Sequence, residues 1–316
     1  MTAQKPAETG GDAVLPVLIA DYRAARESLE RLARHFLERE QAIRARPEPG
    51  RLATHAANGH QPGAPGPVLT VYCLGQFRME LNGAPVPLPA TGQPLRALKF
   101  LACRGGRPTP RDLLMEVLWP DADAESAANR LRVSLHALRK TLEGNFGRIV
   151  VYENGCYSLD PRGAVAVDAY RFEELWKLGQ EREQAGDTPG SLAYYRSAEG
   201  LYAGEFLAED PYEEWTLLQR EHLKDLHLNI VTRLAAAAEV ERRFMACIDH
   251  SQELLRHDAC NEEAYRMLIR ANTALGRHGR AAAWYRTCEV TLREELGIPV
   301  SGETRALRPA QPATAG

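Results

Sequence analysis

Hydrophobic residues recur at steps of three and four positions near the start of the chain, between Val14 and Arg46. They are Leu15, Leu18, Tyr22, Ala25, Leu29, Leu32, Phe36 and Ile43, and the residues between them are largely arginine and glutamate. A period of 3.5 over four heptads predicts a coiled-coil helix. Its apolar seam needs a partner, which is a second copy of this chain, the chain's own domains or another protein. We favour a homodimer formed through residues 14–46.

The segments on either side of this helix have no apolar periodicity. Residues 1–13 are polar and are expected to be disordered, as are residues 308–316 at the other end of the chain. Residues 47–67 are rich in proline and glycine, and this composition predicts a flexible linker.

The pattern changes to short alternating runs after Val68. One run places Leu69, Val71 and Cys73 on one face, a second does the same with Phe77, Met79 and Leu81, and Asn82-Gly83 then supplies a tight turn. Alternation of this kind is typical of half-buried strands.

A helical period replaces the alternation after Gly92. The first predicted helix has Leu95, Leu98, Leu101 and Ala102 on one face and ends at Gly105-Gly106. The second begins at Thr109-Pro110-Arg111-Asp112, where Thr109 is the expected N-cap, and it ends at Trp119-Pro120. The third covers about 124–142. Two strands around Asn154-Gly155 follow, so residues 68–167 are predicted to form an α+β winged helix-turn-helix.

Residues 168–307 have the pattern of successive amphipathic helices. Gly186 precedes Ser191, Tyr195 and Ala198, and Gly276 precedes Ala281, Tyr285 and Cys288 at nearly the same offsets; a degenerate copy lies around 246–258. Such repetition predicts an all-α, tetratricopeptide-like repeat domain, with one helical bundle as the alternative. The fold class as a whole is therefore mainly α.

The charge is distributed unevenly between these two domains. Residues 68–167 carry 12 Lys and Arg against 9 Asp and Glu, whereas residues 168–307 carry 17 against 25. A basic domain followed by an acidic one favours nucleic-acid binding by the first and protein contacts by the second.

The third predicted helix has the features of a DNA-recognition helix. Ala128, Leu131, Leu135, Leu138 and Leu142 are expected to face the core. The opposite face carries Asn129, Arg130, Arg132, His136, Ala137 and Lys140, with Arg139 at its edge. Apart from Ala137, these side chains offer donors and acceptors that suit bases and phosphates in double-stranded DNA. Val133 lies nearly opposite the core, where it would suit a thymine methyl group, although a single exposed valine needs no explanation. Arg111, at the start of the second helix, and Asn154, at the tip of the wing, are further candidates.

Several short motifs resemble one known family. The runs 96–98, 118–120, 128–131, 138–140 and 155–157 are similar to the DNA-binding domain of the Streptomyces antibiotic regulatory proteins, which is an OmpR-type winged helix. Residues 168–172 and 295–298 resemble the bacterial transcriptional activator domain that follows it in that family. The resemblance implies an activator that binds direct repeats in promoters and contacts RNA polymerase. It places the base contacts at Arg130, Arg132, Val133, Ser134, Ala137 and Arg139. Ala137 departs from the family, where a long polar side chain is common, and the target sequence is therefore open.

Other classes of protein are poorly supported. The sequence has no apolar run long enough to cross a membrane and no signal peptide, so a cytoplasmic protein is expected. The six cysteines form no metal-binding pattern, and no phosphate loop or G-x-S-x-G motif appears, so neither an enzyme nor a cofactor is expected. Two alternatives are a repeat scaffold with a degenerate winged helix and a regulator gated by a small-molecule or nucleotide effector. Anionic effectors would suit Arg242-Arg243 or Arg277-His278-Gly279-Arg280.

Overall fold

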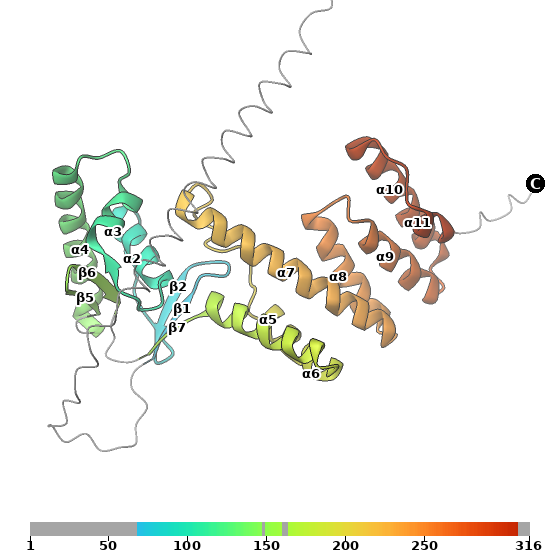
Figure 1. Cartoon of the computed structure of the whole chain (residues 1–316), viewed down its shortest axis with the longest axis horizontal. Coiled ribbons are helices and arrows are strands. Elements are labelled where there is room, and N and C mark those ends of the chain that lie inside the picture. The colour runs from blue at the N-terminus through green and yellow to red at the C-terminus, as the bar shows by residue number, and fades with distance from the viewer. Residues whose placement is uncertain (1–67, 147–148, 160–163, 309–316) are drawn as a thin grey trace, which may run out of the picture. The chain divides into compact units, whose positions relative to one another are not determined.

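The computed structural model describes residues 68–146, 149–159 and 164–308. They are mainly helical with two small sheets, which confirms the mainly α class (Figure 1). The predicted coiled coil at 14–46, the linker at 47–67 and the polar ends of the chain lie outside these residues, apart from Arg308.

A four-stranded sheet opens the described chain, in the order β3-β2-β1-β7. Strand β1 (Val68–Tyr72) pairs with β2 (Arg78–Leu81), which pairs with β3 (Ala84–Pro85). The expected turn between β2 and β3 is present, with Asn82 at φ 52° and Gly83 at φ 81°. Strand β7 (Ala164–Val167) was not predicted. It pairs in parallel with β1 from about a hundred residues away.

The winged helix-turn-helix follows the sheet. Its helices are α2 (Gln93–Cys103), α3 (Arg111–Leu118) and α4 (Ala124–Phe146), and its second sheet has the order β4-β6-β5, with β4 (Thr109–Pro110), β5 (Val150–Glu153) and β6 (Cys156–Leu159). The apolar faces of the three helices and the inner face of the hairpin share one core with the first sheet.

The expected N-cap at Thr109 is wrong. Thr109 and Pro110 form a short strand paired with Tyr157 and Cys156, and α3 begins at Arg111 with no side-chain cap. The residue before a proline favours an extended backbone, which suits strand pairing. The wing supplies the missing acceptor instead, because the Arg111 N–H donates to the Gly155 carbonyl at 3.0 Å.

The C-terminal part of the described chain consists of paired helices. The helices are α5 (Asp168–Gln184), α6 (Thr188–Glu199), α7 (Glu214–Val240), α8 (Phe244–His257), α9 (Glu262–Ala274), α10 (His278–Leu296) and the short α11 (Gly302–Ala306). The residues that match between the predicted repeats, Ser191, Tyr195 and Ala198 in α6 and Ala281, Tyr285 and Cys288 in α10, are all buried.

Three turns between these helices have the same geometry. Gly186, Arg242 and Gly276 adopt φ values of 76°, 58° and 70°. In each turn this residue donates its N–H to the carbonyl three positions back, and the next residue donates to the carbonyl five positions back. This is the Schellman arrangement, which ends a helix with a left-handed residue. Its recurrence, together with the 34 positions that separate Arg242 from Gly276, supports the repeat over the single bundle.

Partly buried polar contacts join the winged helix-turn-helix to the helical repeats. The ammonium group of Lys99 in α2 lies 2.9 Å from the Glu209 carboxylate and 2.5 Å from the Asp210 carboxylate, with a side chain only 4% exposed. Arg96 in α2 donates to Glu213 at 2.7 Å. The loop that carries these acids is fixed by Arg220, whose guanidinium donates to four of its carbonyls. The basic residues of α2 therefore hold the two domains together.

Among the described residues, no helix has the length and apolar character needed to cross a membrane.

Candidate nucleic-acid interface

Helix α4 presents two distinct faces. Leu131, Leu135, Leu138 and Leu142 are at most 2% exposed and pack into the core, as predicted. Ala127, at 3%, takes the core position expected for Ala128, which is only partly buried. The opposite face exposes Asn129, Arg130, Arg132, Val133, His136 and Lys140. The exposed fraction of Val133 is 61%, a large value for an apolar side chain.

Three of the predicted contact residues are less exposed than the others. Ser134 is only 5% exposed, so its side chain does not lie on the solvent face. Ala137 and Arg139 are partly buried. Arg139 donates to the Val150 carbonyl at 3.4 Å, which ties α4 to the hairpin behind it. This geometry gives Arg139 a role in placing the wing beside the helix.

Asp123 fixes the start of α4. One of its carboxylate oxygens accepts from the N–H of Ser126 at 2.9 Å and from the N–H of Glu125 at 3.1 Å. These bonds satisfy donors that every helix leaves open at its first turn. The hydrogen bond from Ser126 is the main reason that the pKa of Asp123 lies below its usual value.

A cleft of about 950 Å³ lies between the first turns of α4 and the wing. Arg111, Asn129, Arg132, Tyr152 and Tyr157 line it, together with Ala128, Leu131, Ser126 and two acids, Asp123 and Glu125. The Arg132 guanidinium donates to the Asn129 amide oxygen at 2.7 Å, so both polar heads face the same space. Arginine and asparagine are the side chains that make paired hydrogen bonds with guanine and adenine edges.

The two tyrosines of the cleft were not predicted as site residues. Tyr152 on β5 and Tyr157 on β6 are cross-strand partners whose ring centroids are 4.4 Å apart, and Tyr152 is 41% exposed. Burial is the main reason that the pKa of Tyr157 lies above its usual value. The sequence did contain a sign of this pair, because Tyr152 and Tyr157 are placed symmetrically about the Asn154-Gly155 turn.

The wing tip is the predicted tight turn. Asn154 and Gly155 have φ values of 51° and 79°, and both are exposed. The Arg111 side chain is also exposed and lines the cleft. Its backbone N–H donates to the Gly155 carbonyl, so this N–H is not free to bind a phosphate.

Comparison with known proteins identifies the helical domain. Residues 167–310 match the family model described as the bacterial transcriptional activator domain. We refer to these residues as the activator domain. The activator domain begins at the last residue of β7 and includes all of the helical repeats.

Two curated relatives extend the similarity beyond the activator domain. The chain is 27% identical over 228 residues to the regulatory protein AfsR of Streptomyces coelicolor, of which this covers only 22%. It is 23% identical over 256 residues to the regulatory protein DnrI of Streptomyces peucetius, of which this covers 91%. Both relatives are regulatory proteins by name. The resemblance to the Streptomyces antibiotic regulatory proteins is confirmed.

A solved structure supports the fold. The chain superposes on Mycobacterium tuberculosis EmbR, determined in complex with a low-affinity phosphopeptide, with a TM-score of 0.58. The match has 24% identity and covers 76% of this chain and 63% of that one.

The basic clusters considered for an anionic effector lie at turns of the activator domain. Arg242 occupies the left-handed position between α7 and α8, and Arg243 pairs with Glu241 at 2.7 Å. Arg277 precedes α10 and contacts the Met245 sulfur at 3.4 Å. Arg242, Arg243 and Arg277 thus make their contacts at the ends of helices.

Proposed function

We propose that this protein is a transcription regulator that binds double-stranded DNA in a sequence-specific manner through the exposed face of α4. The observation that carries the proposal is the separation of the two faces of that helix. A continuous leucine face is buried in the domain, while Arg130, Arg132 and Lys140 project from the other side. A recognition helix needs this arrangement to enter a major groove.

The same face offers both kinds of contact that DNA recognition requires. Cationic side chains neutralise phosphates and position the protein, whereas side chains aimed at base edges choose the sequence. Arg132, Asn129 and Val133 are the proposed base contacts, and Arg111 with the wing residue Asn154 contacts the backbone beside them. A degenerate winged helix has no reason to keep this basic face.

The activator domain is proposed to contact protein rather than DNA. Residues 168–307 carry a net charge of −8, which opposes binding to a polyanion. By resemblance to the Streptomyces regulators, the proposed partner is RNA polymerase and the proposed outcome is activation. The contacts of Lys99 and Arg96 would hold this acidic domain in a fixed orientation over the bound promoter.

A homodimer on repeated sites is the proposed assembly, and it rests on the heptads at 14–46. Light scattering on the full chain and on a chain that starts at Val68 tests it, since only the longer chain should form dimers. If both the full chain and the shorter chain are monomers, the proposed dimer is wrong, but the proposed DNA binding by α4 is not affected.

Salt dependence tests the proposed DNA binding. If six phosphates are neutralised, affinity for duplex DNA in a fluorescence anisotropy titration should fall by roughly a thousandfold between about 50 and 200 mM salt. The triple variant Arg130→Ala/Arg132→Ala/Lys140→Ala should bind DNA more weakly. Its affinity should also depend less steeply on salt concentration, because fewer phosphates are neutralised. If the DNA affinity of the wild type does not change with salt, the proposed interface is ruled out.

A further inference from the structure

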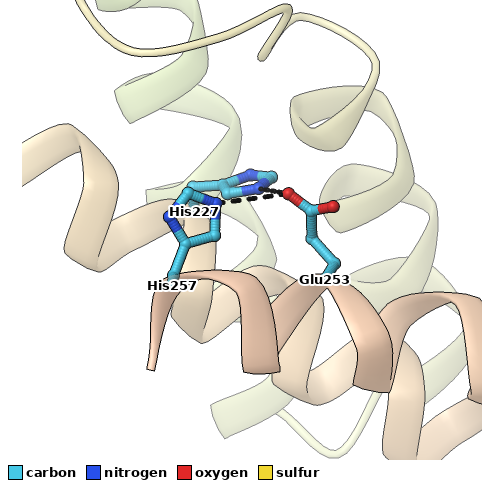
Figure 2. Close-up of side chains that lie close together, drawn as sticks. All are labelled: His227, Glu253 and His257. Atoms are coloured by element: carbon cyan, nitrogen blue, oxygen red, sulfur yellow. Dashed lines mark hydrogen bonds and ion pairs between the residues drawn. The ribbon is translucent and has the colours of Figure 1, made fainter. Parts of the chain in front are cut away.

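Three side chains with metal-binding atoms meet between two helices of the activator domain. His227 comes from α7, and Glu253 and His257 come from α8 (Figure 2). A carboxylate oxygen of Glu253 lies 3.3 Å from Nε2 of His257 and 3.8 Å from Nε2 of His227. One ligand atom from each residue lies within 4.8 Å of the other two.

These distances suit ligands of one small cation. Zinc binds histidine nitrogens and carboxylate oxygens at about 2.0–2.2 Å, which places the ligands of a tetrahedral site roughly 3.2–3.6 Å apart. The Glu253 oxygen lies 3.3 and 3.8 Å from the two histidine nitrogens, which is close to that range. A rotation of one side chain would be enough to bring all three ligand atoms to one ion. The two residues on α8 are four positions apart, and this spacing puts them on the same face of a helix.

The polar atoms around the cluster are incompletely paired. His227 is 5% exposed, and its Nδ1 has no hydrogen-bond partner among the described residues. The Tyr202 ring stacks on the imidazole at 3.9 Å and excludes water from that side. The neutral ring can offer the Nε2 lone pair to a cation, and its proton would then stay on Nδ1, which has no acceptor among the described residues.

Charged side chains surround the cluster. Glu199 pairs with His250 at 3.2 Å on the neighbouring turn of α8, and it interacts electrostatically with His227. Arg256 pairs with the second oxygen of Glu253, the one turned away from the histidines. That pairing holds the carboxylate in place and leaves its first oxygen directed at both imidazoles, as Figure 2 shows.

We propose that His227, Glu253 and His257 form a binding site for one divalent first-row transition metal ion, such as zinc, between α7 and α8. Two imidazoles and one carboxylate are a ligand set that zinc uses in proteins, and harder cations such as magnesium prefer oxygen ligands. Three protein ligands leave at least one coordination position to water, so the metal would exchange with solvent. The inference does not depend on DNA binding.

The location of the site gives the metal a structural role. It would join α7 to α8 at the packed centre of the activator domain. Tyr202, which stacks on His227, belongs to the loop whose Phe206 forms a β-bridge with Leu74 of the DNA-binding domain. A bound ion would therefore stabilise the activator domain close to its junction with the winged helix-turn-helix.

Zinc binding to the full chain tests the proposal. Metal-free protein is titrated with Zn²⁺ against a chromophoric chelator, and Co²⁺ is then used to record the absorption bands of the bound ion. The wild type should hold one Zn²⁺ more per chain than Glu253→Gln or His257→Gln, or bind it at least tenfold more tightly. It should also show a cobalt spectrum that both variants lack. These two residues are half-buried, and circular dichroism checks that the variants fold.

The matched control is His222→Gln. His222 lies on α7 and is 56% exposed, so it represents an ordinary surface histidine of the same helix. The His222→Gln variant should keep the zinc affinity and the cobalt spectrum of the wild type. The same control shows how much loss of any one surface histidine changes weak zinc binding. Zinc held equally by the wild type, Glu253→Gln and His257→Gln, or by none of them, would overturn the proposal.

Discussion

The Asp168 carboxylate accepts hydrogen bonds from the backbone N–H of Cys73 at 2.9 and 3.0 Å. It also accepts the N–H of Leu74 at 3.0 Å and that of Ala169 at 2.7 Å, and its side chain is buried. Because Asp168 begins α5, one carboxylate joins the end of the first strand to the start of the activator domain.

Asp168→Asn should destabilise the protein by about 2–4 kcal/mol, because an amide carries no charge and turns two N–H donors toward backbone donors. Urea denaturation measures the loss. Asp225→Asn, an exposed aspartate on α7, is the control and should change stability by less than about 0.5 kcal/mol. Similar losses in the two variants would show that the buried carboxylate has no special role.

Arg130→Ala and Arg132→Ala should each weaken binding to a preferred DNA site by about 1–3 kcal/mol if the arginine contacts a base. Both side chains are exposed, so folding should be unaffected. Competition binding with singly mutated sites separates the two kinds of contact, because loss of a base contact relaxes preference at one position. Arg286→Ala, an exposed arginine on α10, should bind like the wild type. Wild-type affinity in both α4 variants would mean that another face contacts DNA.

Val133 is expected to contact a thymine methyl group. Replacing that thymine with deoxyuridine should weaken wild-type binding by about 0.5–1 kcal/mol, the value of one buried methyl group. Val133→Ser should bind both DNAs equally, since it has no apolar surface to lose. Scanning each thymine of the site in turn identifies the position. If no single deoxyuridine distinguishes the two proteins, Val133 does not contact a base.

Features that depend on neighbours in sequence were predicted well. Asn82-Gly83 and Asn154-Gly155 form the expected turns because few other residues adopt two successive left-handed conformations. The buried face of α4 follows from its leucine spacing. Ser134 shows the limit of carrying over contacts by resemblance. It follows Leu131 by three positions and precedes Leu138 by four, which is the spacing of the buried face.

Features that depend on distant segments were missed. The backbone of Thr109 is paired with a wing about fifty residues later, and β7 exists only because β1 offers it an edge. The proposed metal site was missed for the same reason. Glu253 and His257 share a helix face, but nothing in the sequence indicates that His227 lies opposite them. Such pairings arise from packing between elements and leave no periodic signal.

Arg242→Gly should stabilise the protein by about 0.5–1 kcal/mol. Arg242 has a φ of 58°, a conformation that costs an ordinary residue roughly 1–2 kcal/mol and a glycine very little. The gain is reduced by the greater freedom of glycine in the unfolded chain and by the loss of the contact between Arg242 and the Phe244 ring. Thermal unfolding measures it. Arg286→Gly, in the interior of α10, should instead lose about 1 kcal/mol. A loss in both variants would show that the Phe244 contact outweighs the backbone strain.

Glu183 should contribute stability that depends on pH. Its carboxylate accepts from the Tyr195 hydroxyl at 2.6 Å and from Arg233 at 2.9 Å. The hydrogen bond from Tyr195 is the main reason that the pKa of Glu183 is below its ordinary value, and the Arg233 charge adds to it. Because the folded pKa is lowered, the contribution is fully present above the unfolded pKa of about 4.5 and is lost as the pH falls through the folded value. The side chain is 47% exposed, so we expect only about 0.5–1 kcal/mol near pH 7.

The comparison that checks this is Glu183→Gln against the wild type in urea, near pH 7 and again near pH 3. The variant should be less stable than the wild type near pH 7, and the difference should shrink near pH 3. Tyr195→Phe keeps the buried ring but removes the hydroxyl, so part of its deficit should also disappear in acid. A difference between Glu183→Gln and the wild type that is the same at both pH values would mean that ionised Glu183 gains nothing from Tyr195 and Arg233.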